Sequence, residues 1–155
     1  MINKIGRVFM ADKKELTEKE RREEILEELY NMYQIDEMVK FSELDIAEKL
    51  QNNTYWIVKF RDLLFKAQAE YDYLEGLLEK LSGQRYNYYR FDYDKELDKS
   101  EIKNYYLPQD PKIIHMKKIL ARQKVKVEFF KMCVAGMEKQ QWNMKNFLDS
   151  LKGNI

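Results

Sequence analysis

The 155-residue sequence contains one cysteine, one histidine, two prolines and five glycines. The single cysteine, Cys133, excludes an internal disulfide framework and is typical of a protein from a reducing cytoplasm. The single histidine, His115, excludes a multi-histidine metal site. Glycine is too rare for a loop that cradles phosphates, and the sequence contains no nucleophile elbow. We therefore expect a protein that is not an enzyme and that uses no metal or cofactor.

Long apolar runs are also missing, so we expect neither a signal peptide nor a membrane span. The composition is 45% hydrophobic and 35% charged, and its few helix breakers favour one all-α domain of long helices. The formal net charge of +1 predicts no class of partner. Its distribution is more informative, because residues 11–49 carry a net charge of −6 and residues 111–155 carry +7. The acidic part is suited to contacting partner proteins or the basic part of a neighbouring copy.

The C-terminal segment 111–152 has the clearest helical pattern. Asp110 and Pro111 are typical of a helix start, and Gly153 is typical of a helix end. Between them, apolar residues recur at the a and d spacing of a coiled coil, with Gln123 and Gln141 as polar interruptions. The apolar positions are Ile113, Met116, Leu120, Val127, Phe130, Val134, Met137, Met144, Leu148 and Leu151.

These ten apolar positions form one stripe along the helix, here called the seam, and a seam of this length predicts self-association. Six heptads make about 60 Å of helix, which we expect to be too long for one small domain to cover. The alternative is that the helix packs inside its own chain. A row of mostly basic residues follows one edge of the seam and becomes a candidate polyanion surface if the helix oligomerises. The row comprises Lys117, Lys124, Lys131, Glu138, Lys145 and Lys152.

The rest of the chain divides into a loose N-terminal arm, residues 1–14, and a single helical domain, residues 15–155. Thr17 and Glu20 form a capping-box pattern at the start of a helix over 17–33. Ser42 begins a second long heptad helix, 42–82, and Gly83 is in the expected place for its end. A short helix over 100–107 follows later. Two long heptad helices predict an antiparallel or bundle arrangement.

The link over 84–99 contains five aromatic residues within eight positions, together with Arg85 and Arg90. Alternation places Tyr89, Phe91 and Tyr93 on one face of an extended strand. Aromatic rings beside arginines are typical of surfaces that bind unpaired bases and phosphates. The alternative is a short hairpin whose aromatic side chains cover the end of the bundle.

Several short segments occur in an order that resembles a known family. They are Leu26–Leu29 followed by Ile35-Asp36, the Ser82-Gly83 pair, Lys99–Lys103 (KSEIK), Cys133 with Gly136, and Trp142–Asp149 (WNMKNFLD). Together they resemble the UvsY family, the recombination mediator proteins of T-even-type bacteriophages, over roughly residues 25–150.

The resemblance implies a non-enzymatic, all-helical protein of the infected bacterial cytoplasm. It implies a homo-oligomeric ring of about six or seven subunits, formed through the C-terminal region. Such mediators bind single-stranded DNA, help to displace the phage single-strand-binding protein, and load a RecA-like recombinase onto the strand.

This sequence departs from the family at one position of functional importance. The basic Lys-x-Arg pair that the family uses for DNA falls here near Glu75 and Leu77. We therefore expect the DNA contacts to have moved to the aromatic link and its neighbours, with bases stacking on the rings and phosphates meeting the basic side chains. The candidate residues are Lys80, Arg85, Tyr86, Tyr88, Tyr89, Arg90, Phe91, Lys99 and Lys103. The main alternative is a coiled-coil scaffold or adaptor with no role at DNA.

Overall fold

The computed structural model describes residues 17–153, and long helices dominate this part of the chain. The all-α prediction is therefore confirmed, whereas the predicted loose arm, residues 1–14, lies outside the described residues. The four principal helices are α1 (Glu18–Tyr33), α2 (Ile35–Val39), α3 (Ile46–Asn87) and α6 (Pro111–Gly153).

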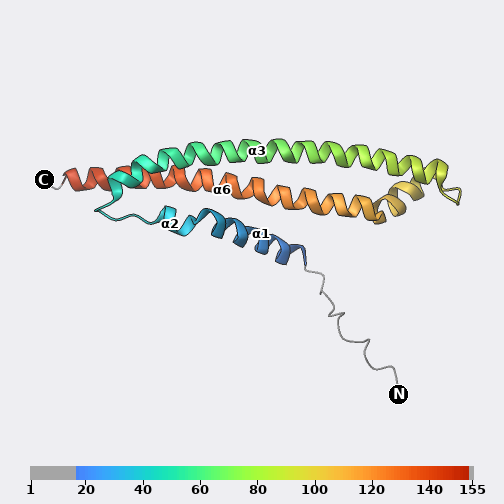
Figure 1. Ribbon diagram of the computed structural model, residues 1–155, viewed down its shortest axis with the longest axis horizontal. Helices are drawn as coiled ribbons and strands as arrows, with labels where there is room; N and C mark the ends of the chain where they lie inside the picture. Colours follow the sequence, from blue (N-terminus) through green and yellow to red (C-terminus); the bar gives the residue numbers. More distant parts are fainter. Residues whose placement is uncertain (1–16, 154–155) are drawn as a thin grey trace, which may run out of the picture.

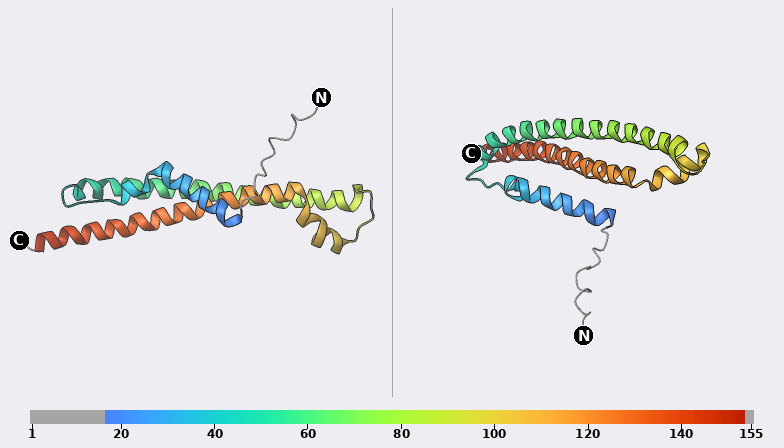
Figure 2. Two further views of the ribbon diagram at one scale, coloured as in Figure 1. Left: turned by 90° about the horizontal axis from the view of Figure 1, so that it is seen from below. Right: turned by 45° about the vertical axis from the view of Figure 1, so that its right-hand side comes forward.

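The two long helices form a hairpin. In Figure 1, α3 runs toward the right and α6 returns beside it toward the left, while α1 and α2 lie along the other side of α6. The right-hand view of Figure 2 shows the same order, with α6 between α3 and α1, and the left-hand view shows α6 crossing α3 at an angle. The distal end of the hairpin is closed by the segment between α3 and α6.

The hairpin buries the α6 seam inside its own chain. Five of its apolar residues are buried and the other five are partly buried. The buried residues are Ile113, Val127, Phe130, Met137 and Met144, and the partly buried residues are Met116, Leu120, Val134, Leu148 and Leu151. The expectation that one small domain could not cover six heptads is wrong, because α3 has 42 residues against the 43 of α6.

Aromatic packing and two buried amides fix how the helices meet. Tyr33 of α1 lies edge-on to Phe60 of α3 and to Phe130 of α6, with ring centroids 5.6 and 5.7 Å apart. The amide of Asn53 donates to the Met137 carbonyl, and that of Gln123 donates to the Ala67 carbonyl, each over 2.9 Å. Because a buried amide must keep its hydrogen bond, these two contacts oppose any sliding of α3 along α6.

The start of α3 differs from the prediction. The helix begins at Ile46, whereas residues before it form a turn in which the Asp45 carboxylate accepts hydrogen bonds from the Ser42 amide and hydroxyl, over 2.5 and 2.8 Å. Ser42 is therefore a partner within the turn and not the cap of the long helix. The predicted first helix start is as observed, since Thr17 caps α1 in a complete capping box with Glu20.

The end of α3 differs more. The helix continues through Gly83 to Asn87 and passes into a π-helical turn, η1 (Tyr88–Asp92), so the extended strand expected around Tyr89 is wrong. Gly83 does not have the positive φ of a glycine that terminates a helix. After η1 the chain forms α4 (Lys99–Glu101), a second π-helical turn η2 (Ile102–Tyr106) and α5 (Leu107–Gln109) in place of the single short helix.

Cys133 lies in the core between these helices, and burial raises the pKa of its thiol to about 11. At pH 8 this leaves about a hundredfold less thiolate than an ordinary cysteine would have. We therefore expect native protein to react with a disulfide reagent at least tenfold more slowly than protein unfolded in guanidinium. Equal reaction rates in the two states would show that Cys133 is accessible and that the core assignment is wrong.

Candidate nucleic-acid interface

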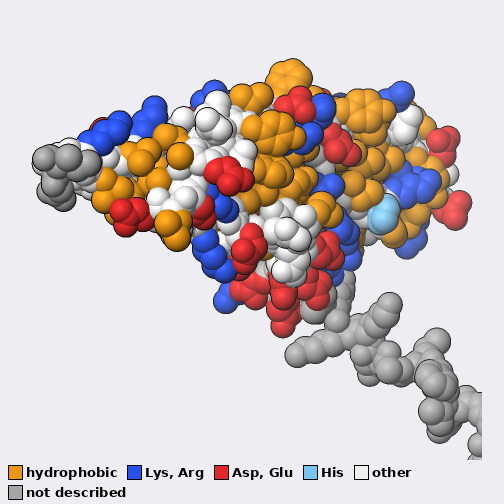
Figure 3. Space-filling view, turned by 60° about the vertical axis from the view of Figure 1, so that its left-hand side comes forward, with side chains coloured by type: hydrophobic (Ala, Val, Ile, Leu, Met, Phe, Trp, Pro, Cys, Tyr) orange, Lys and Arg blue, Asp and Glu red, His pale blue; other side chains and the backbone are white. Residues whose placement is uncertain are grey.

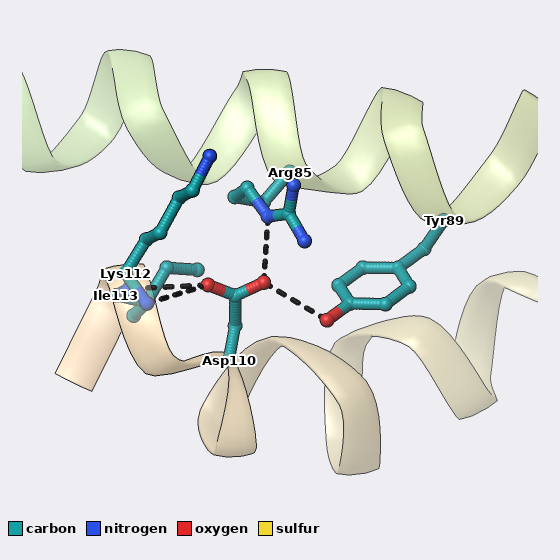
Figure 4. A network of polar contacts seen from close by, with 5 residues as sticks. All are labelled: Arg85, Tyr89, Asp110, Lys112 and Ile113. Carbon is teal, nitrogen blue, oxygen red and sulfur yellow. Dashed lines mark hydrogen bonds and ion pairs between the residues drawn. The ribbon is translucent and has the colours of Figure 1, made fainter. Parts of the chain in front are cut away.

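The distal end of the hairpin is organised around one buried carboxylate, that of Asp110, which is shown in Figure 4. Its Oδ2 accepts hydrogen bonds from Arg85 Nε at 2.6 Å and from the Tyr89 hydroxyl at 2.9 Å. Its Oδ1 accepts from the amides of Lys112 and Ile113 at 2.9 and 3.3 Å. Asp110 is thus both the cap of α6 and the attachment point for the end of α3.

The electrostatics of this network favour the ionised carboxylate. Burial raises the pKa of the Asp110 carboxyl, but the hydrogen bonds from Arg85, Tyr89 and the two amides outweigh burial, so the pKa lies below its ordinary value. The hydrogen bond to Asp110 raises the pKa of Arg85, and burial raises the pKa of Tyr89. The network therefore holds a fixed ion pair at neutral pH, in which Arg85 is 19% exposed and Asp110 is fully buried.

The aromatic residues of the link form a second core at this end. Tyr89, Leu97 and Ile102 are buried together, and four further residues pack against them. Those four are Tyr86, Tyr93, Tyr106 and Leu107. Arg90 Nη1 donates to the Leu97 carbonyl over 2.7 Å and so ties the link to this core. The link has no hairpin, but aromatic side chains do cover the end of the bundle.

The structure therefore separates the nine candidate residues into two groups. Four of them hold the fold together, namely Arg85, Tyr86, Tyr89 and Arg90. The other five are exposed at the same end of the hairpin and do not tie it together, namely Lys80, Tyr88, Phe91, Lys99 and Lys103, whereas Arg90 is exposed but also bonds to the Leu97 carbonyl. Phe91 is 77% exposed, and Arg85 Cζ lies 4.2 Å from the centroid of the Tyr88 ring. The exposed group offers rings for stacking beside lysines.

The charge at this end is close to balanced. Residues 80–103 contain six Lys or Arg and five Asp or Glu. By contrast, the outward-facing lysines of α6 have little acidic compensation, because Glu128 and Glu138 of that helix pair with Arg22 and Arg61. The sequence shows this lysine row, but it does not show that the acidic residues beside it are already paired. Trp142, which is exposed on the same helix, was not among the predicted DNA-binding residues.

Other kinds of site find no support in the described part of the chain. Among residues 17–153, no group of His, Cys, Asp and Glu side chains is placed to hold a metal ion. No helix in this range combines the length and the apolar composition that a membrane span requires.

Comparison with known proteins identifies the fold. No protein-family model matches the chain, and no curated protein sequence matches it significantly. Among solved structures, the crystal structure of the recombination mediator protein UvsY of bacteriophage T4 matches with a TM-score of 0.72 at 16% sequence identity. The match covers 84% of this chain and 98% of the UvsY chain. The chain therefore has the UvsY fold, as the resemblance predicted.

Proposed function

We propose that this protein is a recombination mediator, which binds single-stranded DNA and helps a RecA-like recombinase to replace the single-strand-binding protein. The observation that carries this proposal is the match to UvsY along 98% of that chain with a TM-score of 0.72. At 16% identity the likeness transfers no individual residue. The contacts with DNA must therefore be argued from the side chains of this chain.

At the distal end, the exposed group supplies those contacts. Bases would stack on Phe91 and Tyr88, and phosphates would meet Lys80, Lys99 and Lys103. We assign the primary contacts to the lysines because the side chains of Arg85 and Arg90 also hold this end together, through Asp110 and the Leu97 carbonyl. Replacing either arginine would change the fold of this end, so lysines are the better residues for mutation.

We also propose that the protein works as a homo-oligomer of about six or seven subunits, as the resemblance implies. Because the α6 seam packs against α3 of the same chain, we propose that the subunits meet through another surface. The outer face of α3 offers one, since Tyr55, Val58, Phe65 and Tyr73 are exposed there, opposite the core-facing Phe60. Figure 3 shows apolar side chains along the upper part of the molecule, over α3, and acidic side chains at the lower edge, over α1. Repeated DNA sites in an assembly raise the effective concentration for one strand.

The same apolar row supports the rival function, a scaffold or adaptor that binds only proteins. Binding of DNA distinguishes the mediator function from the scaffold function, because only a mediator is expected to bind DNA. Fluorescence anisotropy of a labelled oligo-dT should show binding at low salt and weaker binding at moderate salt. At the same salt concentration, a duplex of the same length should bind more weakly than the single strand. No binding of oligo-dT at low salt would contradict the mediator function and leave the scaffold.

A further inference from the structure

The fold does not use a row of lysines on the side of α6 that is exposed between its neighbours, here called its outer face. Lys117, Lys124 and Lys131 follow one another at intervals of seven residues, which corresponds to about 10 Å along a helix. All three are exposed, and they form no ion pair within residues 17–153. Lys139 and Lys145 extend the exposed basic surface toward the C-terminal end of the helix. Five like charges on one helix repel one another, so the fold gains nothing from this row by itself.

The acidic residues that would neutralise this row are engaged elsewhere. Glu128 Oε2 lies 2.9 Å from Arg22 Nη2 of α1, and Glu138 pairs with Arg61 of α3. Asp149 is the one further acidic residue of α6. Lys117 and Lys124 also line the α6 wall of a groove of about 1090 Å³ between α1 and α6. The opposite wall, from α1, has three acidic and three basic residues, whereas the α6 wall has four basic residues and one acidic residue, so the attraction for a polyanion comes from the α6 side.

Trp142 lies on the same helix, eleven residues beyond Lys131 or about 16 Å along the axis. Its side chain is 65% exposed. The second tryptophan, Trp56, is partly buried and packs against Phe60, with ring centroids 5.9 Å apart. Trp142 thus provides a large ring with no packing role comparable to that of Trp56, and Lys139 and Lys145 lie three residues before and after it in the sequence. An exposed aromatic ring among lysines is the combination that binds unpaired bases and their phosphates together.

We propose that the outer face of α6 is a binding surface for single-stranded DNA, in which Lys117, Lys124 and Lys131 contact phosphates and Trp142 stacks on a base. This inference rests on the proposed DNA function and gives the strand a second, more basic contact region than the distal end. A single strand is favoured over duplex DNA because its bases are free to stack on the ring, and over an acidic protein segment because such a segment presents no bases.

The test uses the full-length protein and fluorescein-labelled oligo-dT in an anisotropy titration over several salt concentrations. The variant combines Lys117→Gln, Lys124→Gln and Lys131→Gln. Its matched control combines Lys40→Gln, Lys59→Gln and Lys66→Gln, which removes the same charge from exposed positions outside the groove and the distal end. We expect the α6 variant to bind at least tenfold more weakly at low salt and to lose about 2 from the slope of log affinity against log salt. We expect the control to change affinity less than threefold.

Trp142 is tested through its own fluorescence. Oligo-dT should quench the tryptophan emission of wild type and of Trp56→Phe, and this quenching should disappear in Trp142→Leu together with a loss of about tenfold in affinity. Because all substituted residues of the α6 surface are exposed, their thermal melting curves by circular dichroism should match wild type. Polyglutamate serves as the competitor that offers charge without bases, and it should compete far less well than unlabelled oligo-dT.

The outcomes separate this inference from the proposed function. If wild type binds oligo-dT and the α6 lysine variant binds equally well with the same salt slope, the α6 surface is refuted while the DNA function stands. If polyglutamate competes as well as oligo-dT and Trp142→Leu is without effect, the surface recognises charge alone, and its assignment to single-stranded DNA is overturned. If wild type does not bind oligo-dT, the proposed function itself fails.

Discussion

Replacing Val127 by aspartate is expected to destabilise the folded chain by about 4 kcal/mol or more, because it places a carboxylate without a cation partner in the core. Val127 is 5% exposed and belongs to the buried cluster that α3 and α6 share. Total stabilities of small domains are about 5–15 kcal/mol, so this one change should remove much of the folded population. Circular dichroism at 222 nm, followed during urea unfolding, measures the effect.

The matched control is Phe65→Asp, which introduces the same charge on the outer face of α3. Phe65 is 75% exposed within its own chain, so the subunit should keep the helicity of wild type in the absence of urea. Light scattering should instead show a smaller assembly, because this residue lies in the proposed contact between subunits. If Val127→Asp kept its helicity and lost only its oligomeric mass, the α6 seam would join subunits, and its packing within one chain would be wrong.

The second large effect is expected for Asp110→Ala. This substitution removes the cap of α6 and leaves the partly buried Arg85 without its counter-ion, so it should destabilise the fold by about 3 kcal/mol. In a chain of this size that corresponds to a melting temperature lower by about 6–12 °C. Asp98→Ala is the control, since Asp98 caps the short exposed helix α4 and should cost about 1 kcal/mol. Equal losses in the two variants would show that Asp110 acts only as a cap.

The contribution of Asp110 should also depend on pH. Its pKa is lower in the folded chain than in the unfolded chain, so its stabilising effect is present above the unfolded pKa of about 3.9. The effect is lost as the pH falls through the folded pKa, because the carboxyl then becomes protonated in both states. The difference in unfolding free energy between wild type and Asp110→Asn should therefore be largest at pH 7 and shrink below about pH 4. A difference that stayed constant from pH 7 to pH 2.5 would contradict an ionised Asp110.

The long helices were predictable from the sequence because their apolar residues repeat over many turns. The cap at Thr17 was predictable for a similar reason, since both members of its capping box lie within four residues. The partner of the α6 seam could not be predicted in the same way. Periodicity shows which face of a helix is buried, but it does not show whether α3 of the same chain or another copy buries it.

The end of α3 was not predictable from local patterns. Ser82-Gly83 is a good stop signal, but tertiary contacts override it: Arg85 and Tyr89 both bond to Asp110, which lies 25 and 21 residues further along the chain. The same contacts explain why the candidate site was predicted only in part. Once residues 84–92 are helical, Tyr89 faces the core and Phe91 faces solvent, whereas a strand would place them on one face.

The most direct test of the mediator function is the ATP hydrolysis of a T-even phage recombinase on single-stranded DNA that its cognate single-strand-binding protein already covers. Adding this protein should raise the hydrolysis rate severalfold, and the Lys117, Lys124 and Lys131 glutamine variant should give little or no increase. No increase with wild-type protein, at concentrations where it binds the strand, would contradict the mediator function and leave a DNA-binding protein with the UvsY fold.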